Sequence, residues 1–449
     1  MSRSRPDSSG EASRGLTVHW LAFAATSVAL SGLFAVLIAL ARVPAIGQLF
    51  PGAEFYKVAL TLHVNLSQGV WFMAFAAVLW TFHQAREHPA LDRGILWLAG
   101  LGALGITLSI AIGTPQPLMS NYLPVIDSPT FLSGLLVFGL AVIAAACLAL
   151  PRLPFGTLRS HGEVRAFGLW LGAAGFVICG LILAIAAARI PPEHEGHAYF
   201  ELLFWGAGHA WQFVLVILMM VCWLELAGAR TLRAAPRQLA TAFAVAAVPL
   251  LFALGQALAL PPDSDAYLNG YTRLMQWASW PAPALLLGFL LLPHRGQTRP
   301  LPGFTLSIGL LSAGIVLGIL IDGQTTLVTA HYHGTIGSVT LAFMAMALAM
   351  LPRLGAVPPD RRWIRMQLGC YGYGILLMML GLAGAGLMGA PRKTPGELGL
   401  FWNVETVSRI CLGIGGLLAT VGILMFAYLI LSRLWPHAQS RRLQDPLTR

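Results

Sequence analysis

Four histidines lie well inside apolar stretches that are long enough to cross a membrane. They are His63, His209, His331 and His333. An ionisable side chain inside a membrane is energetically costly and usually marks a functional site. Imidazole is also the commonest metal ligand among protein side chains. The chemistry of this chain is therefore expected at these four residues.

His331 and His333 are separated by one tyrosine, in the sequence 330-AHYH-333. Two positions correspond to about 200° around a helix, so the two imidazoles point in nearly opposite directions. They cannot hold one ion from a single helix face, but each can ligate its own centre on either side. Two haems with axial histidines suit that geometry. Gly334 and Gly337 leave room for close approach, of a macrocycle or of a neighbouring helix.

The four histidines are expected at a similar depth. At about 1.5 Å per residue from the expected helix starts, each lies roughly 8–12 Å below the outer surface. For any one of them, the alternative is a histidine that is hydrogen-bonded to a neighbouring helix. Four imidazoles in one layer favour a common site.

The elements that position these residues are twelve expected membrane helices. The chain has 449 residues, of which 57% are hydrophobic and only 10% charged, which is typical of an integral membrane protein. The sequence predicts an all-α, polytopic fold with a membrane domain over 16–433 and polar tails over 1–15 and 434–449. The apolar runs are 17–42, 56–83, 95–113, 130–150, 166–190, 201–226, 238–260, 274–293, 304–321, 326–351, 366–390 and 406–433.

The basic residues predict the orientation of the chain. With twelve spans, 21 of the 28 Lys and Arg fall on the side of both termini. By the positive-inside rule, both termini are expected in the cytoplasm, as in a bacterial inner-membrane protein. The net charge of +10 thus reflects topology, and without a basic patch no nucleic-acid partner is expected. No C-x-x-C-H sequence occurs, which excludes covalent c-type haem.

One cationic pair, Arg392 and Lys393, emerges at the outer end of the eleventh expected helix. Haem propionates need cations, and arginine binds carboxylates through two parallel hydrogen bonds. Ordinary loop charge is the alternative. Beside the histidine layer, we expect the pair to bind propionates.

These features resemble subunit I of the haem-copper oxidases, a superfamily that includes cytochrome c oxidases and nitric oxide reductases. The resemblance covers essentially the whole chain, with key histidines on the second, sixth and tenth helices. The tenth-helix A-H-Y-H is similar to the family's A-H-F-H, and 389-GAPRK-393 to its G-M-P-R-R. The segment 121-NYLPVIDSPTFLSGL-135 resembles the region of helices three and four in shorter family members.

The resemblance implies a role for each site residue. His331 would ligate a high-spin haem, and His63 and His333 a low-spin haem. Arg392 and Lys393 would meet the propionates. His209 matches the sixth-helix histidine that the family uses as one of three copper ligands.

The chain departs from the family at the copper site. The family's other two copper ligands are adjacent histidines on the seventh helix, where this chain has Gln256 and Ala257. The tyrosine that oxygen-reducing members have four residues after the sixth-helix histidine is here Phe213. One imidazole does not bind copper tightly, so two haems are expected and copper is in question.

Three functions remain open. The first is a respiratory-type oxidoreductase that passes electrons from the low-spin to the high-spin haem, which binds oxygen or nitric oxide. The second is a copper-free dihaem electron conduit or gas sensor without turnover. The third is a twelve-helix transporter with a histidine-lined site. Expected partners are membrane lipid, a diatomic gas, and a partner subunit or cytochrome c-type electron donor implied by the resemblance.

Overall fold

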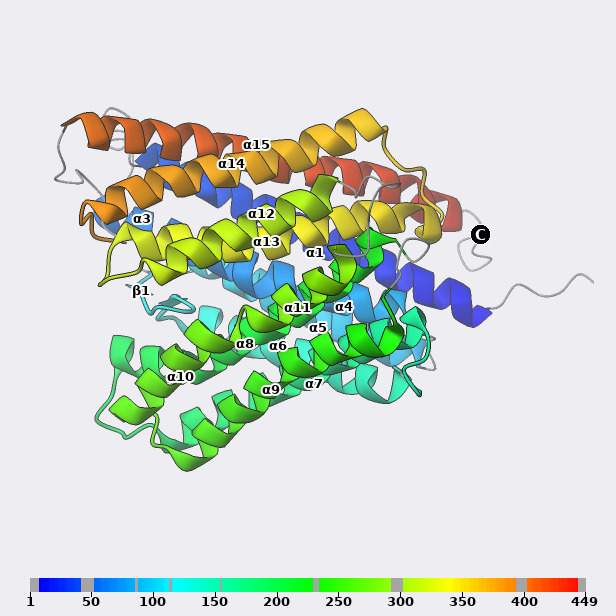
Figure 1. The fold of residues 1–449 in the computed structure, drawn as a ribbon, viewed down its shortest axis with the longest axis horizontal. Coiled ribbons are helices and arrows are strands. Elements are labelled where there is room, and N and C mark those ends of the chain that lie inside the picture. The colour runs from blue at the N-terminus through cyan, green and yellow to red at the C-terminus, as the bar shows by residue number, and fades with distance from the viewer. Residues whose placement is uncertain are drawn as a thin grey trace, which may run out of the picture. The chain divides into compact units, whose positions relative to one another are not determined.

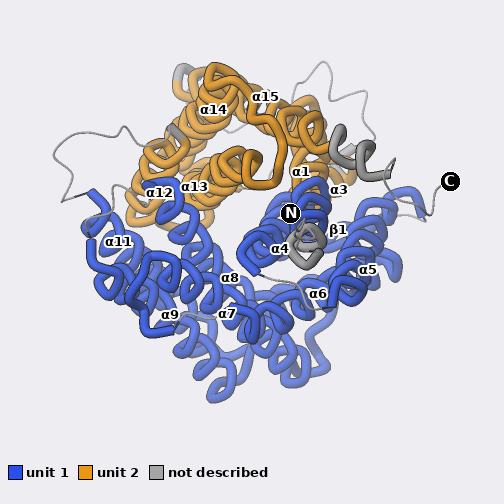
Figure 2. The backbone as a smooth tube through the Cα atoms, turned by 90° about the vertical axis from the view of Figure 1, so that its right-hand side faces the viewer, with its two compact units in different colours: residues 1–23, 64–298 blue, residues 24–63, 299–449 orange. Residues whose placement is uncertain are grey.

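The computed structural model describes residues 8–41, 52–84, 88–112, 115–153, 156–228, 234–291, 302–392 and 402–442. Within these ranges the chain is almost entirely helical (Figure 1), which confirms the predicted all-α fold. It forms two compact units (Figure 2): unit 1 comprises residues 1–23 and 64–298, and unit 2 residues 24–63 and 299–449. The chain passes from one unit to the other within helices α1 (Ser8–Ala41) and α3 (Gly52–Val64).

Unit 1 contains eight further α-helices and three short helical turns. The α-helices are α4 (Phe72–Phe82), α5 (Pro89–Leu108), α6 (Pro129–Ala149), α7 (His161–Arg189), α8 (Gly196–Ala227), α9 (Pro236–Ala259), α10 (Asp265–Ala278) and α11 (Pro281–Leu291). The turns are the π-helix η1 (Asn65–Trp71) and the 3₁₀ turns η2 (Ser109–Ala111) and η3 (Leu150–Arg152). Between α5 and α6, the strands β1 (Pro117–Leu118) and β2 (Val125–Ile126) pair antiparallel, with Pro117 opposite Ile126.

Unit 2 carries the tenth expected span and its neighbours. Its remaining elements are α12 (Pro302–Ile319), α13 (Thr326–Met350), the 3₁₀ turn η4 (Leu351–Leu354), α14 (Arg361–Leu387) and α15 (Trp402–Arg442). Helix α13, which holds His331 and His333, packs against both α12 and α14.

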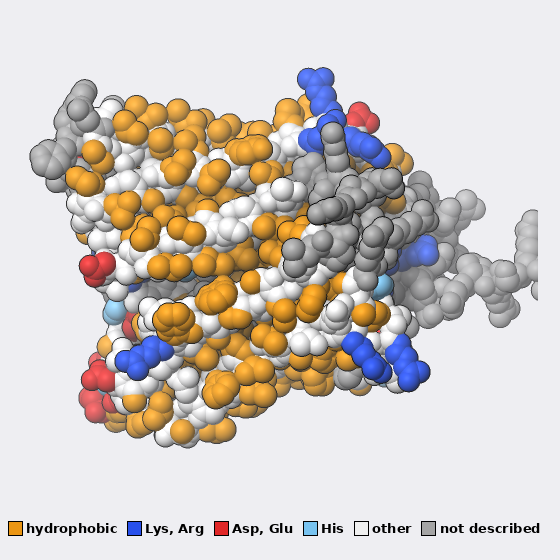
Figure 3. Space-filling model, in the orientation of Figure 1, with side chains coloured by type: hydrophobic (Ala, Val, Ile, Leu, Met, Phe, Trp, Pro, Cys, Tyr) orange, Lys and Arg blue, Asp and Glu red, His pale blue; other side chains and the backbone are white. Residues whose placement is uncertain are grey.

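The predicted membrane spans are present. Among the described residues, eleven helices are long and apolar enough to cross a membrane, and the shorter apolar helix Gly303–Ile319 lies where the ninth span was predicted. The chain is therefore an integral membrane protein. Figure 3 shows hydrophobic side chains along the helices and most of the visible charged side chains near helix ends. The side of the membrane on which each terminus lies stays a prediction.

The helix boundaries differ from expectation in three places. Helix α1 begins at Ser8 and α15 ends at Arg442, so helix extends into both expected polar tails. The eighth span begins at Asp265 instead of 274 and is divided before Pro281 into α10 and α11. Ser264 caps α10 by accepting a hydrogen bond from the backbone N–H of Tyr267 (3.2 Å). Because α10 is rich in polar residues, hydropathy alone does not reveal its start.

Glycines allow neighbouring helices within a unit to pack backbone to backbone. In unit 2, a Cβ at Gly334 of α13 would lie 2.7 Å from the Cα of Gly314 in α12. In unit 1, a Cβ at Gly102 of α5 would lie 2.7 Å from the carbonyl oxygen of Gly134 in α6. Small residues at such crossings are characteristic of membrane helix packing. They fix the distance between the helices that hold the site residues.

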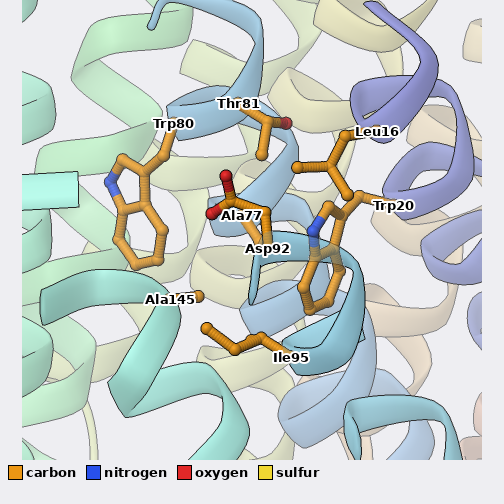
Figure 4. Close-up of a pocket in the computed structure, with 8 residues that line it drawn as sticks. All are labelled: Leu16, Trp20, Ala77, Trp80, Thr81, Asp92, Ile95 and Ala145. Atoms are coloured by element: carbon orange, nitrogen blue, oxygen red, sulfur yellow. The ribbon is translucent and has the colours of Figure 1, made fainter. Parts of the chain in front are cut away.

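A buried ion pair ties α5 to η3 within unit 1. Arg152 Nη1 lies 3.1 Å from Asp92 Oδ1, and the side chains of Arg152 and Asp92 are only 8% and 3% exposed. Figure 4 shows the Asp92 carboxylate between Trp20 and Trp80, in a small pocket that is otherwise lined largely by apolar groups. A charge in such surroundings depends on its partner.

Replacing Asp92 with asparagine should destabilise the protein by about 3 kcal/mol, because the guanidinium of Arg152 would remain buried without a counter-charge. Thermal unfolding of the detergent-solubilised chain measures the change. The control is Arg409→Met, which breaks a more exposed ion pair with Glu405 and should cost less than about 1 kcal/mol. Equal losses from the two substitutions would contradict the interpretation.

Candidate cofactor site

His331 of α13 is held against α12. Its Nδ1 lies 2.7 Å from the carbonyl oxygen of Gly314. One turn along α12, Gly318 lies directly under the imidazole, since a Cβ there would be 2.6 Å from Nδ1 and 2.8 Å from Cε1. The ring is half-buried. Two glycines of one helix thus determine where this imidazole lies.

His333 is anchored differently, as the spacing predicts. Its Nδ1 lies 2.7 Å from the carbonyl oxygen of Thr329, one turn back on α13 itself. The ring of Tyr332 stacks on it, with centroids 4.8 Å apart. Whereas His331 bonds to α12, His333 bonds within its own helix. The two imidazoles therefore have separate environments, which fits two separate centres.

His63 lies at the end of α3, just before the π-helix η1. Its Nδ1 lies 3.0 Å from both the carbonyl oxygen and the Oγ of Ser31 in α1. The Ser31 hydroxyl in turn donates to the His63 carbonyl oxygen (3.0 Å). π-Helical turns inside α-helices often occur at functional sites. The sequence gave no sign of Ser31, because a serine in a membrane helix most often bonds within that helix.

These hydrogen bonds determine the protonation of the imidazoles. A backbone carbonyl only accepts, so the Nδ1 that faces it carries the proton. The neutral ring then has its lone pair on Nε2. Metal-ligating histidines are held in this way, with one nitrogen donating to a carbonyl and the other binding the metal. By this test, His63, His331 and His333, all in unit 2, fit axial ligation of haem iron.

The basic segment after α14 is fixed to the start of α13. The backbone N–H of Arg392 donates to the carbonyl oxygen of Gln324 (3.3 Å), and that of Thr326 to Ala390 (2.8 Å). Arg392 thus lies in unit 2, at the end of α13 that carries His331. Lys393 lies outside the described residues.

Two sequence expectations about α13 are modified. Gly334 and Gly337 pack against other helices: a Cβ at Gly334 would meet α12 and Met379, and one at Gly337 would meet Ile375. Their role is helix packing, the alternative stated above.

The equal depth of the histidines does not follow from the observed helix starts. α3 and α8 begin at Gly52 and Gly196, before the expected starts at 56 and 201. His63 and His209 are therefore further from their helix starts than His331 and His333 are from Thr326. The common layer stays a prediction.

His209 belongs to unit 1, in α8, and is 4% exposed. Its Nδ1 lies 2.7 Å from the carbonyl oxygen of Trp205, so its lone pair is also on Nε2. Three aromatic rings surround it: the centroids of Tyr122, Trp205 and Tyr271 lie 4.6, 5.0 and 5.7 Å from that of the imidazole. We call these three residues the aromatic cage of His209.

Sequence reasoning did not assign Tyr122 to the site. It comes from the turn between β1 and β2, and its ring lies on Gly208, where a Cβ would be 2.4 Å from Cγ. Gln212 Nε2 donates to its hydroxyl (3.3 Å). Asn65 Nδ2 bonds to Pro124 O (2.7 Å) and thereby secures the same turn. The segment 121-NYLP-124 was noted only for its resemblance to a family region.

The groups around His209 do not fit copper. Over the part of the chain that the structure describes, no three His, Cys, Asp or Glu side chains come together as a metal site. Aromatic rings and the amide of Gln212 are poor copper ligands. At the positions of the family's histidine pair, Gln256 approaches Gly270 of α10 and Ala257 is buried. No step is therefore assigned to copper.

Comparisons with known proteins identify relatives along most of the chain. It is 26% identical to an uncharacterised protein of Rickettsia prowazekii (strain Madrid E), over 91% of this chain and 94% of that protein. It is 29% identical to an uncharacterised protein of Aquifex aeolicus (strain VF5), over 75% and 84%. No protein-family model matches the chain.

Two further comparisons concern the oxidases. Cytochrome c oxidase subunit 1 of Thermus thermophilus is 24% identical, over 86% of this chain and 77% of that protein. The solved structure of a haem-copper terminal oxidase dimer shares the fold, with a TM-score of 0.66 at 16% identity, over 94% of this chain and 84% of the other. The chain is thus a membrane protein distantly homologous to, and folded like, haem-copper oxidase subunit I.

Proposed function

We propose that the chain is a haem-binding, respiratory-type membrane oxidoreductase. His63 and His333 are the axial ligands of a low-spin haem, and His331 is the ligand of a high-spin haem. The observation that carries the proposal is the anchoring of each Nδ1 to a backbone carbonyl, which presents an Nε2 lone pair from each imidazole. Bound there, haem would supply electron transfer and an open iron position for oxygen or nitric oxide.

The protein's own groups have distinct tasks in this proposal. Ser31, Gly314 and Thr329 orient the ligating rings through their oxygens. Arg392 and Lys393 bind the propionates, and the hydrogen bonds between the start of α13 and the Ala390–Arg392 segment keep the arginine near His331. His209 presents an acceptor nitrogen within its cage and therefore takes up protons instead of holding copper.

A second candidate function is a copper-free dihaem electron conduit or gas sensor without turnover. The observation that favours it is the aromatic environment of His209, which offers no second metal ligand. In both cases we propose a bacterial inner membrane with cytoplasmic termini. The electron donor would be a partner subunit or a cytochrome c-type protein.

The test is the haem and copper content of the purified chain, with reduced-minus-oxidised and CO-difference spectra. We expect two haems per chain, no copper, and CO binding at one haem. His331→Ala should abolish the CO-binding haem, whereas His63→Ala and His333→Ala should each remove the low-spin spectrum. Stoichiometric copper would restore a conventional oxidase site. An absence of haem would reject the proposal and leave the transporter.

Gly318→Ala should impair binding of the high-spin haem specifically, because the new methyl group would displace the imidazole of His331. We expect the CO-binding fraction to fall several-fold while the low-spin spectrum is retained. Gly309→Ala, on the same helix, is the matched control, since a Cβ there meets nothing within 4 Å. The same CO-binding fraction in both variants would show that His331 does not ligate this haem.

A further inference from the structure

Two polar atoms inside unit 1 lack a hydrogen-bond partner within the described part of the chain. They are the hydroxyl oxygen of Tyr267 in α10 and Oε1 of Gln256 in α9. Tyr267 is only 1% exposed. A buried polar atom left without a partner is destabilising, and such atoms are rare in folded proteins. Each one therefore calls for a physical reason.

The space around the two atoms is provided by glycines. A Cβ at Gly206 of α8 would lie 2.2 Å from the Tyr267 hydroxyl, and a Cβ at Gly270 of α10 would lie 2.2 Å from Gln256 Oε1. No other residue type leaves that space open. Tyr267 and Gly270 are three residues apart and so share one face of α10. The hydroxyl and the amide oxygen thus approach the same region between α8, α9 and α10.

The neighbouring Tyr271 shows what a satisfied phenol looks like here. Its hydroxyl donates to the carbonyl oxygen of Ala253 in α9 (2.6 Å). Its ring lies 4.8 Å from that of Tyr267 and 5.7 Å from the imidazole of His209. Phenylalanine would fill the place of Tyr267 without an unpaired hydroxyl. The chain nevertheless keeps the hydroxyl, two ring contacts from His209.

We propose that Tyr267 and Gln256 hold one internal water molecule in unit 1. Tyr267 donates to the water, and the water donates to Gln256 Oε1. Water is the smallest molecule that both accepts and donates, and buried waters typically satisfy groups of this kind. This site is separate from the haem ligands, so it stands whether or not the proposed haems bind.

Stability measurements on the purified full-length chain test this proposal, because the water reverses the sign of the effect. If the water is present, Tyr267→Phe removes a hydrogen bond and should lower Tm by about 1–3 °C. If it is absent, the same substitution removes an unsatisfied group and should raise Tm. An increase in Tm would overturn the proposal.

A double-mutant cycle provides the control. Tyr267 and Gln256 do not hydrogen-bond to each other, so Tyr267→Phe and Gln256→Met should be non-additive only if a shared molecule joins them. Gln367 in α14 also has an unpartnered buried Oε1 among the described residues, and Gln367→Met should add to Tyr267→Phe independently. Density for a water within hydrogen-bonding distance of both atoms in a high-resolution map would support the proposal; additivity in both cycles would overturn it.

Discussion

The candidate site depends on one type of interaction, the hydrogen bond from imidazole Nδ1 to a backbone carbonyl. It occurs at His63, His209, His331 and His333, with carbonyls supplied by three different arrangements. Thr329 and Trp205 lie one turn back on the same helix, whereas Gly314 and Ser31 belong to a neighbouring one. In each case the bond selects the same tautomer, and a ring held by this bond loses little freedom on binding a metal.

Helix packing in unit 2 exists in a form that makes these bonds possible. The carbonyl of Gly314 reaches His331 because α12 and α13 touch backbone to backbone at Gly314 and Gly334. A larger residue at either position would separate the helices and lengthen the bond. The glycines of α13 therefore act on the cofactor site through helix spacing, and the helix–helix contact and the ligand geometry are one constraint.

The sequence predicted the spans and the histidines well, because each depends on local composition or spacing. The twelve apolar runs match twelve helices, and the separation of His331 from His333 follows from helical geometry alone. The partners could not be predicted. Ser31 and Tyr122 are remote in sequence from the histidines they contact, and Gly318 matters only because α12 presents it to His331. Such pairings are set by tertiary packing, which a single sequence does not encode in readable form.

The surroundings of His209 show how a fold can be kept while a metal site is not. Copper needs several lone pairs directed at one point, and here the neighbours of the imidazole present ring faces instead. Gln256, at the position of one family histidine, directs its amide oxygen toward Gly270, and Tyr271 reaches Ala253 across the same helices. Polar atoms thus remain on α9 and α10, but they suit hydrogen bonding and not metal ligation. Chemistry at His209 is accordingly that of a proton acceptor among aromatic rings.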